Sequence, residues 1–352
     1  MAHGAASQSI PIVTAYNSLG IEGLKHALES TEAVAIFVDA NSISRVGAVF
    51  DSVPTLRFVV YDGDQDVLAQ TVKEHPRLKN VRFISYDDLY RLGQDTETPK
   101  NDPRPDNLFA IFYTSGSTGV PKGVPMKHNN VVAAGLSSLL KVRQCSANVA
   151  FAVAGLDTVI GRHFNKEDRY LAYLPLAHVL EMAFEHACLF WGVCIGYGTP
   201  KTLFDSSTHD CKGDLRALRP TFVLGVPAIW ESVRKAIVDS VHASSHSKKD
   251  RFRRALETRT KQKGCGVAFP PQSDVEEFND ARDMLGGRLR FMLTGGGPTA
   301  AATQKFISVV IAPLVNGFGL TETMAYVHPM RHILGTQSLS QSPPLPNSAN
   351  NE

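Results

Sequence analysis

The stretch that decides the fold is Tyr113-Thr-Ser-Gly-Ser-Thr-Gly-Val-Pro-Lys-Gly123, which holds three glycines, four Ser or Thr hydroxyls and one lysine. Glycine lets the backbone turn sharply and approach a ligand closely, so that successive N–H groups can point at an anion. The hydroxyls add donors, and Lys122 adds a positive charge on a flexible stem. The composition therefore predicts a phosphate-binding loop. It does not fit the Walker A pattern, because Pro121 stands where that pattern requires a glycine.

The surroundings of this loop support the same interpretation. An apolar, strand-like run at 108–113 precedes it, and an apolar-periodic stretch starts at Val124 and continues through Val131, Val132 and Leu136. The alternative is a Ser/Gly-rich surface linker, but a linker needs no lysine at a fixed place. We therefore favour the phosphate loop.

Bulk composition describes an ordinary globular protein of 352 residues, with 43% hydrophobic and 20% charged residues. The net charge of +2 gives no reason to expect a nucleic-acid partner. The five cysteines form no C-x-x-C pair, which argues against a disulfide framework and a zinc site and favours a reduced, intracellular compartment. We expect no secretion, because the first residues lack a signal pattern. The longest apolar run, 187–197, is far shorter than the roughly 20 residues of a membrane span, so any membrane association is expected to be peripheral.

Strand-like apolar runs alternate with helix-period segments along the chain. In one such segment, 227–241, Trp230, Val233 and Ile237 fall on one face and Pro227 stands near the helix start. Alternation of this kind predicts an α/β fold with largely parallel sheets. The strand-like runs are residues 33–38, 56–61, 81–84, 108–113, 170–174, 221–226, 289–294 and 314–318.

Two segments stand apart from this alternation. Residues 244–264 carry eight Lys or Arg and two acids, which fits a membrane-surface or phosphate-binding role; a solvated helical insertion is the interpretation we favour. His242 and His246 have the spacing of a helical metal pair, although chance spacing is favoured because no carboxylate or cysteine supports them. The tail at 331–352 is rich in Ser, Pro, Gln and Asn, and we expect it to be disordered behind a core domain at 1–330.

Two further glycine clusters each follow a strand-like run. They are Thr294-Gly-Gly-Gly-Pro298 and Asn316-Gly-Phe-Gly-Leu-Thr-Glu-Thr323. Either cluster alone is compatible with a simple turn. In open α/β sheets, however, ligands bind at the carboxyl ends of the strands, so three such loops can converge on one nucleotide.

Taken in order, these loops resemble the motifs of the adenylate-forming (AMP-binding) acyl-CoA synthetases. Residues 113–123 resemble the ATP-phosphate motif of that family, and residues 317–323 resemble its second motif. The blocks at 173–181 and 191–197 resemble the long-chain fatty acyl-CoA synthetases, and the opening 9–20 resembles their fungal branch. The resemblance covers roughly residues 8–325. It implies the large N-terminal domain of the adenylate-forming fold, with parallel-rich sheets flanked by helices.

The resemblance implies a long-chain fatty acid–CoA ligase, which is an acid-thiol ligase. Its partners would be a fatty acid, ATP and CoA, with Mg²⁺ as cofactor. ATP would convert the fatty acid to an acyl-adenylate, and CoA would then form the thioester. It also implies a place on the cytoplasmic face of endoplasmic reticulum, lipid droplet or peroxisome membranes, held peripherally. The sequence leaves the oligomeric state open.

The same resemblance assigns roles to individual residues. Lys122 would lie near the β- and γ-phosphates, Thr321 would contact the α-phosphate and Glu322 would hold Mg²⁺. His178 would line the acyl-adenylate pocket, with a packed core histidine as the alternative. The phosphates would be held by Thr114, Ser115, Gly116, Ser117, Thr118 and Gly119, and the adenine and acyl carboxylate would be held by Gly295, Gly296, Gly297, Phe318 and Gly319.

The chain also departs from the family pattern. Family members continue after the second motif with a subdomain that carries a ribose-binding aspartate and then a mobile C-terminal lid that carries a lysine. Here the matching sequence ends near Met324, so we expect a core that is incomplete at both ends and lacks the lid. A lid excludes water and completes the catalytic site, so adenylation would be slow without it. The alternative function is an inactive remnant that binds ATP or an acyl group at most. A Rossmann-type dehydrogenase is disfavoured, because no G-x-G-x-x-G follows an early strand.

Overall fold

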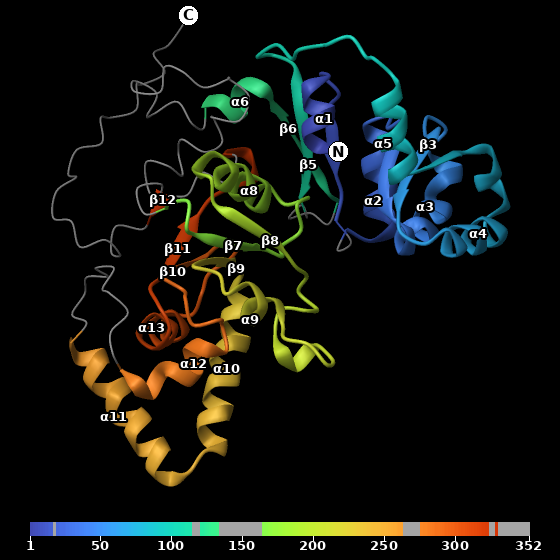
Figure 1. Cartoon of the computed structure of the whole chain (residues 1–352). Helices are drawn as coiled ribbons and strands as arrows, with labels where there is room; N and C mark the ends of the chain where they lie inside the picture. Colours follow the sequence, from blue (N-terminus) through green and yellow to red (C-terminus); the bar gives the residue numbers. More distant parts are fainter. Residues whose placement is uncertain (17–18, 115–119, 134–163, 263–274, 324–327, 330–352) are drawn as a thin grey trace, which may run out of the picture. The chain divides into compact units, whose positions relative to one another are not determined.

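The computed structural model describes residues 1–16, 19–114, 120–133, 164–262, 275–323 and 328–329 (Figure 1). These residues belong to two units. The first unit comprises the described residues within Met1–His163, Leu174–Trp191 and Leu320–Tyr326. The second unit comprises those within Phe164–Tyr173, Gly192–Gly319 and Val327–Glu352.

A three-stranded sheet in the first unit contains the hairpin that flanks the predicted phosphate loop. Its order is β1-β5-β6, and β1 runs parallel to β5, with Ile12 opposite Ala110. Strand β6 runs antiparallel to β5. Helix α1 precedes β1 in the chain, and helix α6 follows β6. The bounds are Ala2–Ser7 for α1, Ile12–Thr14 for β1, Leu108–Thr114 for β5, Lys122–Lys127 for β6 and His128–Ala133 for α6.

A second three-stranded sheet in the same unit has the order β2-β3-β4, with all strands parallel. Helices connect these strands, as parallel pairing requires. Asp64 caps α4 by accepting a hydrogen bond from the Asp66 N–H at 2.8 Å, and Ser85 caps α5 through the Asp88 N–H at 3.0 Å. The bounds are Gly20–Ser30 for α2, Ala35–Asp39 for β2, Ile43–Val49 for α3, Phe58–Asp62 for β3, Gln65–Glu74 for α4, Arg82–Ser85 for β4 and Tyr86–Asp95 for α5.

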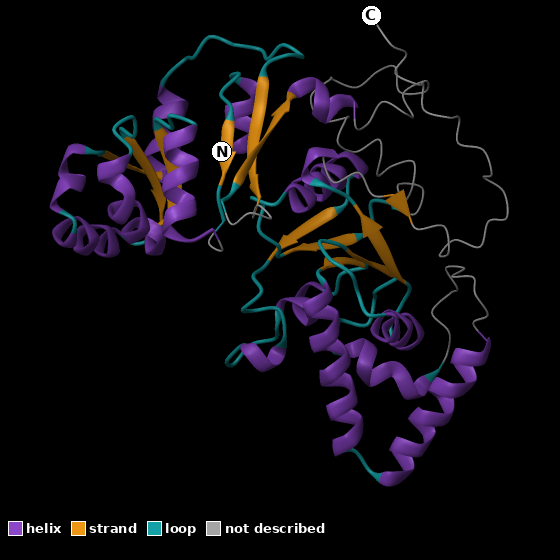
Figure 2. Cartoon of the chain, turned by 180° about the vertical axis from the view of Figure 1, so that it is seen from behind, coloured by secondary structure: helices purple, strands orange, loops and turns teal. Residues whose placement is uncertain are grey.

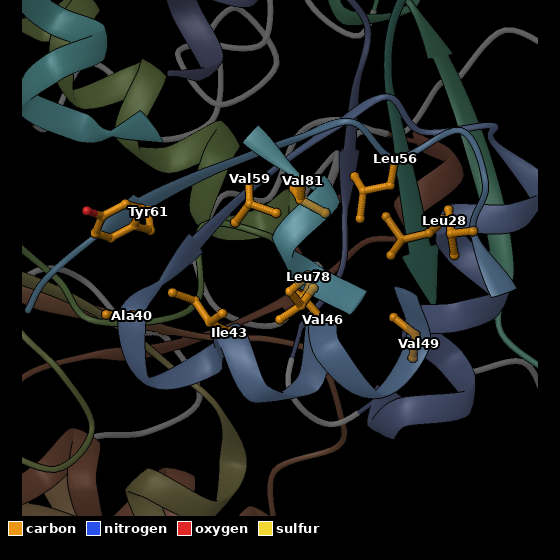
Figure 3. Close-up of a cluster of buried hydrophobic side chains, with 11 residues drawn as sticks. Leu28, Ala40, Ile43, Val46, Val49, Leu56, Val59, Tyr61, Leu78 and Val81 are labelled. Carbon is orange, nitrogen blue, oxygen red and sulfur yellow. The ribbon is translucent and has the colours of Figure 1, made fainter. Parts of the chain in front are cut away.

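The core of this layer lies between the sheet and its helices (Figure 3). Helix α3 contributes Ile43, Val46 and Val49, which are spaced three residues apart and therefore share one helix face. They pack in one cluster with Val59 of β3 and Leu78. Each such side chain contributes about 1.5–3 kcal/mol when it is fully buried. This shared core joins α2, β2 and β3 into one folded body.

The second unit is built on a six-stranded sheet with the order β12-β11-β10-β9-β7-β8 (Figure 2). Its pairs are parallel except for β11 with β12. Every residue of β9 and β10 is buried, as expected for central strands that are covered on both faces. The bounds are Arg169–Ala172 for β7, Cys194–Tyr197 for β8, Phe222–Gly225 for β9, Phe291–Thr294 for β10, Leu314–Phe318 for β11 and His328–Pro329 for β12.

Helices α10, α12 and α13 lie on one side of this sheet (Figures 1 and 2). Helix α10 begins at Pro227, whose fixed φ suits the first helical turn, and buries Trp230, Val233 and Ile237, as the periodicity predicted. A short turn then leads into α11, which packs beside α10. The bounds are Asp214–Leu218 for α9, Pro227–Ala243 for α10, His246–Gln262 for α11, Asn279–Asp283 for α12 and Ala301–Val310 for α13. Helix α8, Val179–Trp191, belongs to the first unit.

Asp168 joins the amino ends of three strands of the six-stranded sheet. It stands directly before β7 and is only 2% exposed. Its Oδ1 accepts a hydrogen bond of 2.6 Å from the hydroxyl of Thr221, which precedes β9. Its Oδ2 accepts one of 2.7 Å from Arg290, which precedes β10. A charged pair of this kind compensates for the cost of burying the carboxylate.

The α/β fold with parallel-rich sheets is confirmed, and all eight of the predicted strand-like runs contain a strand. The stretch from Val124 begins differently from a helix: residues through Lys127 form β6, and α6 starts only at His128. His242 and His246 lie on separate helices, and His246 faces Asp250, with 3.3 Å between Nε2 and Oδ2.

The 1–330 boundary and the disordered tail at 331–352 stay predictions, since 330–352 lie outside the described residues. None of the helices in the described ranges combines the length and the apolar character needed to cross a membrane.

Candidate functional site

The β5–β6 hairpin fixes both ends of the predicted phosphate loop. Thr114 ends β5, Lys122 begins β6, and the two are partners in the antiparallel register. The Lys122 side chain is exposed, whereas Tyr113 beside Thr114 is buried. Of the residues assigned to phosphate binding, Ser115, Gly116, Ser117, Thr118 and Gly119 lie outside the described residues. The lysine thus stands on a strand, at the point where the loop returns to the sheet.

Helix α2 supports the base of this loop. The hydroxyls of Ser30 and Tyr113 share a hydrogen bond, and the ring of His26 meets the ring of Tyr113 edge-on at 5.9 Å. A Cβ added at Gly23 would lie 3.3 Å from Pro121, so this helix approaches the loop closely. Sequence reasoning missed Ser30 and His26, because a serine and a histidine on an amphipathic helix carry no motif.

Gly123 is required by a close approach within the hairpin. A Cβ at this position would lie 2.9 Å from Ile111 Cγ2 and 3.1 Å from the Tyr113 ring. Both neighbours belong to the facing strand β5, which cannot move away without breaking the register. The last glycine of the loop motif therefore serves packing, because it leaves room for the Tyr113 ring beside β6.

The second motif contributes a short 3₁₀ turn, η9 (Thr321–Thr323), to the same unit. This turn contacts β6, the strand that begins at Lys122. Thr321 is half-buried and Glu322 is exposed. The structure therefore brings together the strand of the predicted phosphate-binding lysine and the turn of the predicted metal-binding carboxylate, although they are separated by about two hundred residues in the chain.

His178 caps the start of α8. Its Nδ1 accepts a hydrogen bond of 3.2 Å from the Leu180 N–H, so the ring proton is on Nε2. The residue as a whole is exposed, unlike a packed core histidine, although neighbouring protein atoms surround part of its ring. Desolvation by the neighbouring protein lowers the pKa of the imidazole below its ordinary value. A neutral histidine with Nε2–H available can donate a hydrogen bond to an oxygen of a ligand.

The glycine loops of the second unit leave neighbouring parallel strands at one edge of the sheet. Thr294, the last residue of β10, is the register partner of both Gly225 on β9 and Asn316 on β11. Gly295, Gly296 and Gly297 follow Thr294 directly, and the Gly295 N–H donates to the Gly225 carbonyl at 3.2 Å. Gly296 has a φ of 77°, a left-handed conformation that favours glycine.

A pair of amides orients the strand that leads to Phe318 and Gly319. Asn316 Nδ2 donates to Gln304 Oε1 at 3.0 Å, and Gln304 Nε2 donates to the Leu314 carbonyl at 3.0 Å. Gln304 lies on α13, so the helix after one glycine loop holds the strand before the next. Sequence reasoning did not single out Gln304, because a lone glutamine on a helix is usually solvated.

The predicted site residues are divided between the two units. Thr114, Lys122, His178 and the pair Thr321 and Glu322 belong to the first unit. Gly295, Gly296, Gly297, Phe318 and Gly319 belong to the second. Apart from His178, which stands at the start of α8, the members lie at strand ends or in the turn beside the β5–β6 hairpin, as expected for ligand-binding loops of α/β proteins.

The donor set at η9 fits Mg²⁺. Glu322 offers an exposed carboxylate next to the half-buried hydroxyl of Thr321. Magnesium commonly uses one or two protein carboxylates and completes its shell with substrate phosphates and water. The described residues contain no group of three or more His, Cys, Asp or Glu placed to hold a metal by themselves. A carboxylate beside a phosphate loop is therefore the kind of site that suits a nucleotide-bound Mg²⁺.

Comparison with known proteins identifies the family to which these loops belong. The family model described as AMP-binding enzyme matches residues 1–349. The chain belongs to the AMP-binding enzyme family. Within that family it is 37% identical to long-chain-fatty-acid–CoA ligase 2 of Schizosaccharomyces pombe over 325 residues, and 34% identical to long-chain-fatty-acid–CoA ligase 1 of Saccharomyces cerevisiae over 340 residues.

These alignments cover 92% of this AMP-binding chain but only 44% and 46% of the two ligases. The chain thus spans less than half the length of the curated relatives that it matches. Among solved structures, it resembles the adenylation domain of a carboxylic acid reductase from Segniliparus rugosus, in complex with AMP and a co-purified carboxylic acid. The TM-score is 0.61 at 18% identity, over 91% of this chain and 46% of that chain. The N-terminal domain of FACL13 from Mycobacterium tuberculosis gives a TM-score of 0.51 over 92% of this chain and 60% of that one. These likenesses establish the adenylate-forming fold.

Proposed function

We propose that this chain carries the ATP- and acyl-binding part of a long-chain fatty acid–CoA ligase. The observation that carries the proposal is the 37% identity to the S. pombe ligase across 92% of the chain. The shared region includes the hairpin with Lys122 and the turn with Glu322. Such a ligase would act on a long-chain fatty acid, ATP and CoA.

In the first step, a carboxylate oxygen of the fatty acid would attack the α-phosphorus of ATP, and pyrophosphate would leave. Both reactants are anions, so the protein must neutralise charge and hold them in line. Lys122 would neutralise the β- and γ-phosphates from the start of β6. Thr321 would donate to an α-phosphate oxygen from η9, which contacts the same strand. In the second step, the CoA sulfur would attack the acyl carbonyl carbon, and AMP would leave.

Mg²⁺ would be held by Glu322 and would supply charge neutralisation at the phosphates when bound. The neutral His178, protonated at Nε2, would donate a hydrogen bond toward the acyl-adenylate. The Gly295–Gly297 backbone would let adenine and the acyl carboxylate approach closely, and Phe318 would stack on the adenine ring. Each of these roles is assigned to its residue from the family resemblance.

A second candidate is a binding protein without turnover. The observation that favours it is that the chain spans 44–46% of the length of its curated relatives. Such a protein would bind ATP or a fatty acid through the same hairpin and glycine loops and would release no product.

Two measurements on the purified chain separate the candidates. ATP binding is measured by isothermal titration calorimetry with Mg²⁺, and pyrophosphate release is measured with ATP, Mg²⁺ and palmitate. A ligase releases pyrophosphate and, after addition of CoA, forms palmitoyl-CoA that mass spectrometry detects. ATP binding without pyrophosphate release would overturn the ligase proposal and establish the binding protein. Failure of both measurements would overturn the ligase, and the binding protein would then also be overturned if a calorimetric titration with palmitate showed no binding.

We further place this activity on the cytoplasmic face of endoplasmic reticulum, lipid droplet or peroxisome membranes, with peripheral attachment. Long-chain fatty acids partition into bilayers, so a ligase at the surface meets its substrate there. Fractionation of cells that express the tagged chain tests this location. Release from membranes by high salt is expected, and recovery with secreted proteins would contradict it.

A further inference from the structure

One face of helix α11 lines a cavity of about 420 Å³. The helix supplies residues with the spacing i, i+3, i+4, i+7 and i+8, which places them in one continuous stripe. The opposite wall comes from the segment around the 3₁₀ turn η8 (Glu276–Phe278). The lining residues are Arg251, Arg254, Ala255, Thr258 and Arg259 from α11, and Val275 and Glu277 from the other wall.

The two walls are held together by contacts outside the stripe. The buried Phe252 of α11 meets the ring of Phe278 at 5.2 Å, and both side chains are removed from water. Lys248 forms an ion pair with Asp280. The aromatic contact holds α11 against η8 and the ion pair holds it against α12, so the arginines are presented on a folded surface.

The charges of the cavity favour an anion. Among the lining residues that the structure describes, three are arginines and one, Glu277, carries a carboxylate. Arg251 and Arg254 are exposed, and neither forms a hydrogen bond or ion pair with another residue in the part of the chain that the structure describes. Arg253, which does not line the cavity, instead pairs with Asp250 at 3.1 Å. Arg251 and Arg254 therefore keep their positive charges available, while the charge of the neighbouring Arg253 is neutralised.

We propose that this cavity binds a phosphate group of a phosphorylated ligand, either a soluble organic phosphate or an anionic lipid headgroup. The planar fork of arginine matches two phosphate oxygens at once, which lysine cannot do. The Thr258 hydroxyl adds a donor beside the arginines. A volume of about 420 Å³ lies within the range of small-ligand sites. The site shares no residue with the ATP loop, so it stands whether or not the chain is a ligase.

The full chain tests this site with two probes that share the phosphate chemistry. Glycerol 3-phosphate is titrated by calorimetry, and co-sedimentation is measured with phosphatidylcholine vesicles that contain or lack phosphatidic acid. Arg254→Gln and Arg251→Gln are each expected to weaken binding about tenfold, because each removes a charge-assisted hydrogen bond. Arg253→Gln is the matched control, since it removes the same charge from the same helix outside the cavity. Its effect is expected to stay within about twofold.

The site is supported if either probe binds and if Arg254→Gln weakens that binding about tenfold while Arg253→Gln changes it by no more than about twofold. The probe that binds identifies the source of the phosphate. Equal losses in the two variants would show attraction to the general charge of α11 and would overturn the site. Absence of binding to both probes would overturn it as well. The variants' melting temperatures should match that of the unchanged chain, and Lys122→Ala should leave the affinity for either probe unchanged.

Discussion

Thr114 and Lys122 are register partners at the loop end of the β5–β6 hairpin, and this pairing brings together the two ends of the predicted phosphate loop. Lys122 therefore extends from a strand whose position is set by cross-strand hydrogen bonds. In a Walker A loop the lysine belongs to the start of a helix instead. If Lys122 binds phosphate as we propose, the two arrangements place a cation beside phosphates from different backbones.

Replacement of Lys122 by alanine should weaken ATP binding by about ten- to a hundredfold, because a charge-assisted contact to phosphate contributes about 1.5–3 kcal/mol. AMP affinity should change little, since AMP lacks the β- and γ-phosphates. Calorimetry with both nucleotides measures the difference. Lys127→Ala is the control: Lys127 is an exposed lysine at the other end of β6, 3.9 Å from Asp106. An equal loss for ATP and AMP would contradict the assigned position.

Gly225→Ala should destabilise the chain by about 1–3 kcal/mol, as overpacking of a core does. The new Cβ would lie 2.7 Å from Cζ2 of Trp230, which is only 1% exposed and has no room to move. Gly93→Ala on α5 is the matched substitution, because a Cβ there meets nothing within 4 Å. It should instead stabilise the chain by about 0.5–1 kcal/mol through helix propensity. Urea unfolding measures both, and the same sign for both variants would refute this account of the packing.

Asp168→Ala should cost about 1–3 kcal/mol of unfolding free energy, because it leaves the buried Thr221 hydroxyl without its carboxylate acceptor, whereas the partly exposed Arg290 can turn to water. Asp168→Asn should cost less, since the amide oxygen still accepts one hydrogen bond. The exposed Asp239 on α10 provides the control, and its alanine variant should change stability by no more than about 0.5 kcal/mol. Thermal and urea unfolding measure these losses, and a loss for Asp168→Ala as small as that for Asp239→Ala would contradict the prediction.

His178 and His186 should both titrate below the ordinary histidine value of 6.5. Desolvation is the main cause in each case, and for His186 the ring of His3, at 4.7 Å, adds charge repulsion. At a pH between the lowered pKa of each histidine in the folded chain and its ordinary pKa in the unfolded chain, the folded chain binds fewer protons than the unfolded chain. Stability should therefore fall as the pH drops from about 6.5 through the folded pKa values.

Nitrogen NMR of labelled protein tests this titration directly. His178→Gln and His186→Gln assign the signals, and each variant should reduce the loss of stability in acid. The two rings should also differ in tautomer. His178 accepts at Nδ1, whereas the Nδ1 of His186 donates to the Met182 carbonyl at 2.6 Å. A pKa at or above 6.5 for either ring would contradict the prediction.

Periodicity and glycine placement predicted most of the fold, because burial has a regular spacing along strands and helices. The run at 314–318 became β11 with the same bounds, and Pro227 became the first residue of α10. Strand β6 was not predicted, since its residues 122–127 read Lys-Gly-Val-Pro-Met-Lys and carry neither alternation nor a β-branched run. Only its pairing with β5 makes it a strand, and pairing partners are a property of the whole chain.

The candidate site likewise contains residues that the sequence could predict and residues that it could not. Glycines, hydroxyls and the acidic residue of the motifs could be selected from sequence because their chemistry is unusual in a fixed order. The supports could not, because Ser30, His26 and Gln304 act through contacts with residues that are distant in the chain. Such contacts depend on which face of a helix packs against which strand, and the local sequence pattern does not show how distant elements pack.

The ion-paired Asp168 lies at the amino ends of β7, β9 and β10, while Gly295 and its neighbours lie at the carboxyl ends of β10 and β11. The buried carboxylate and the predicted ligand-binding loops thus lie at opposite ends of the same short strands. An engineer who wishes to alter what the chain recognises can diversify the glycine-loop tip and leave the anchoring tip untouched. Libraries built in this way should retain folded members at a much higher rate than libraries that vary both tips at once.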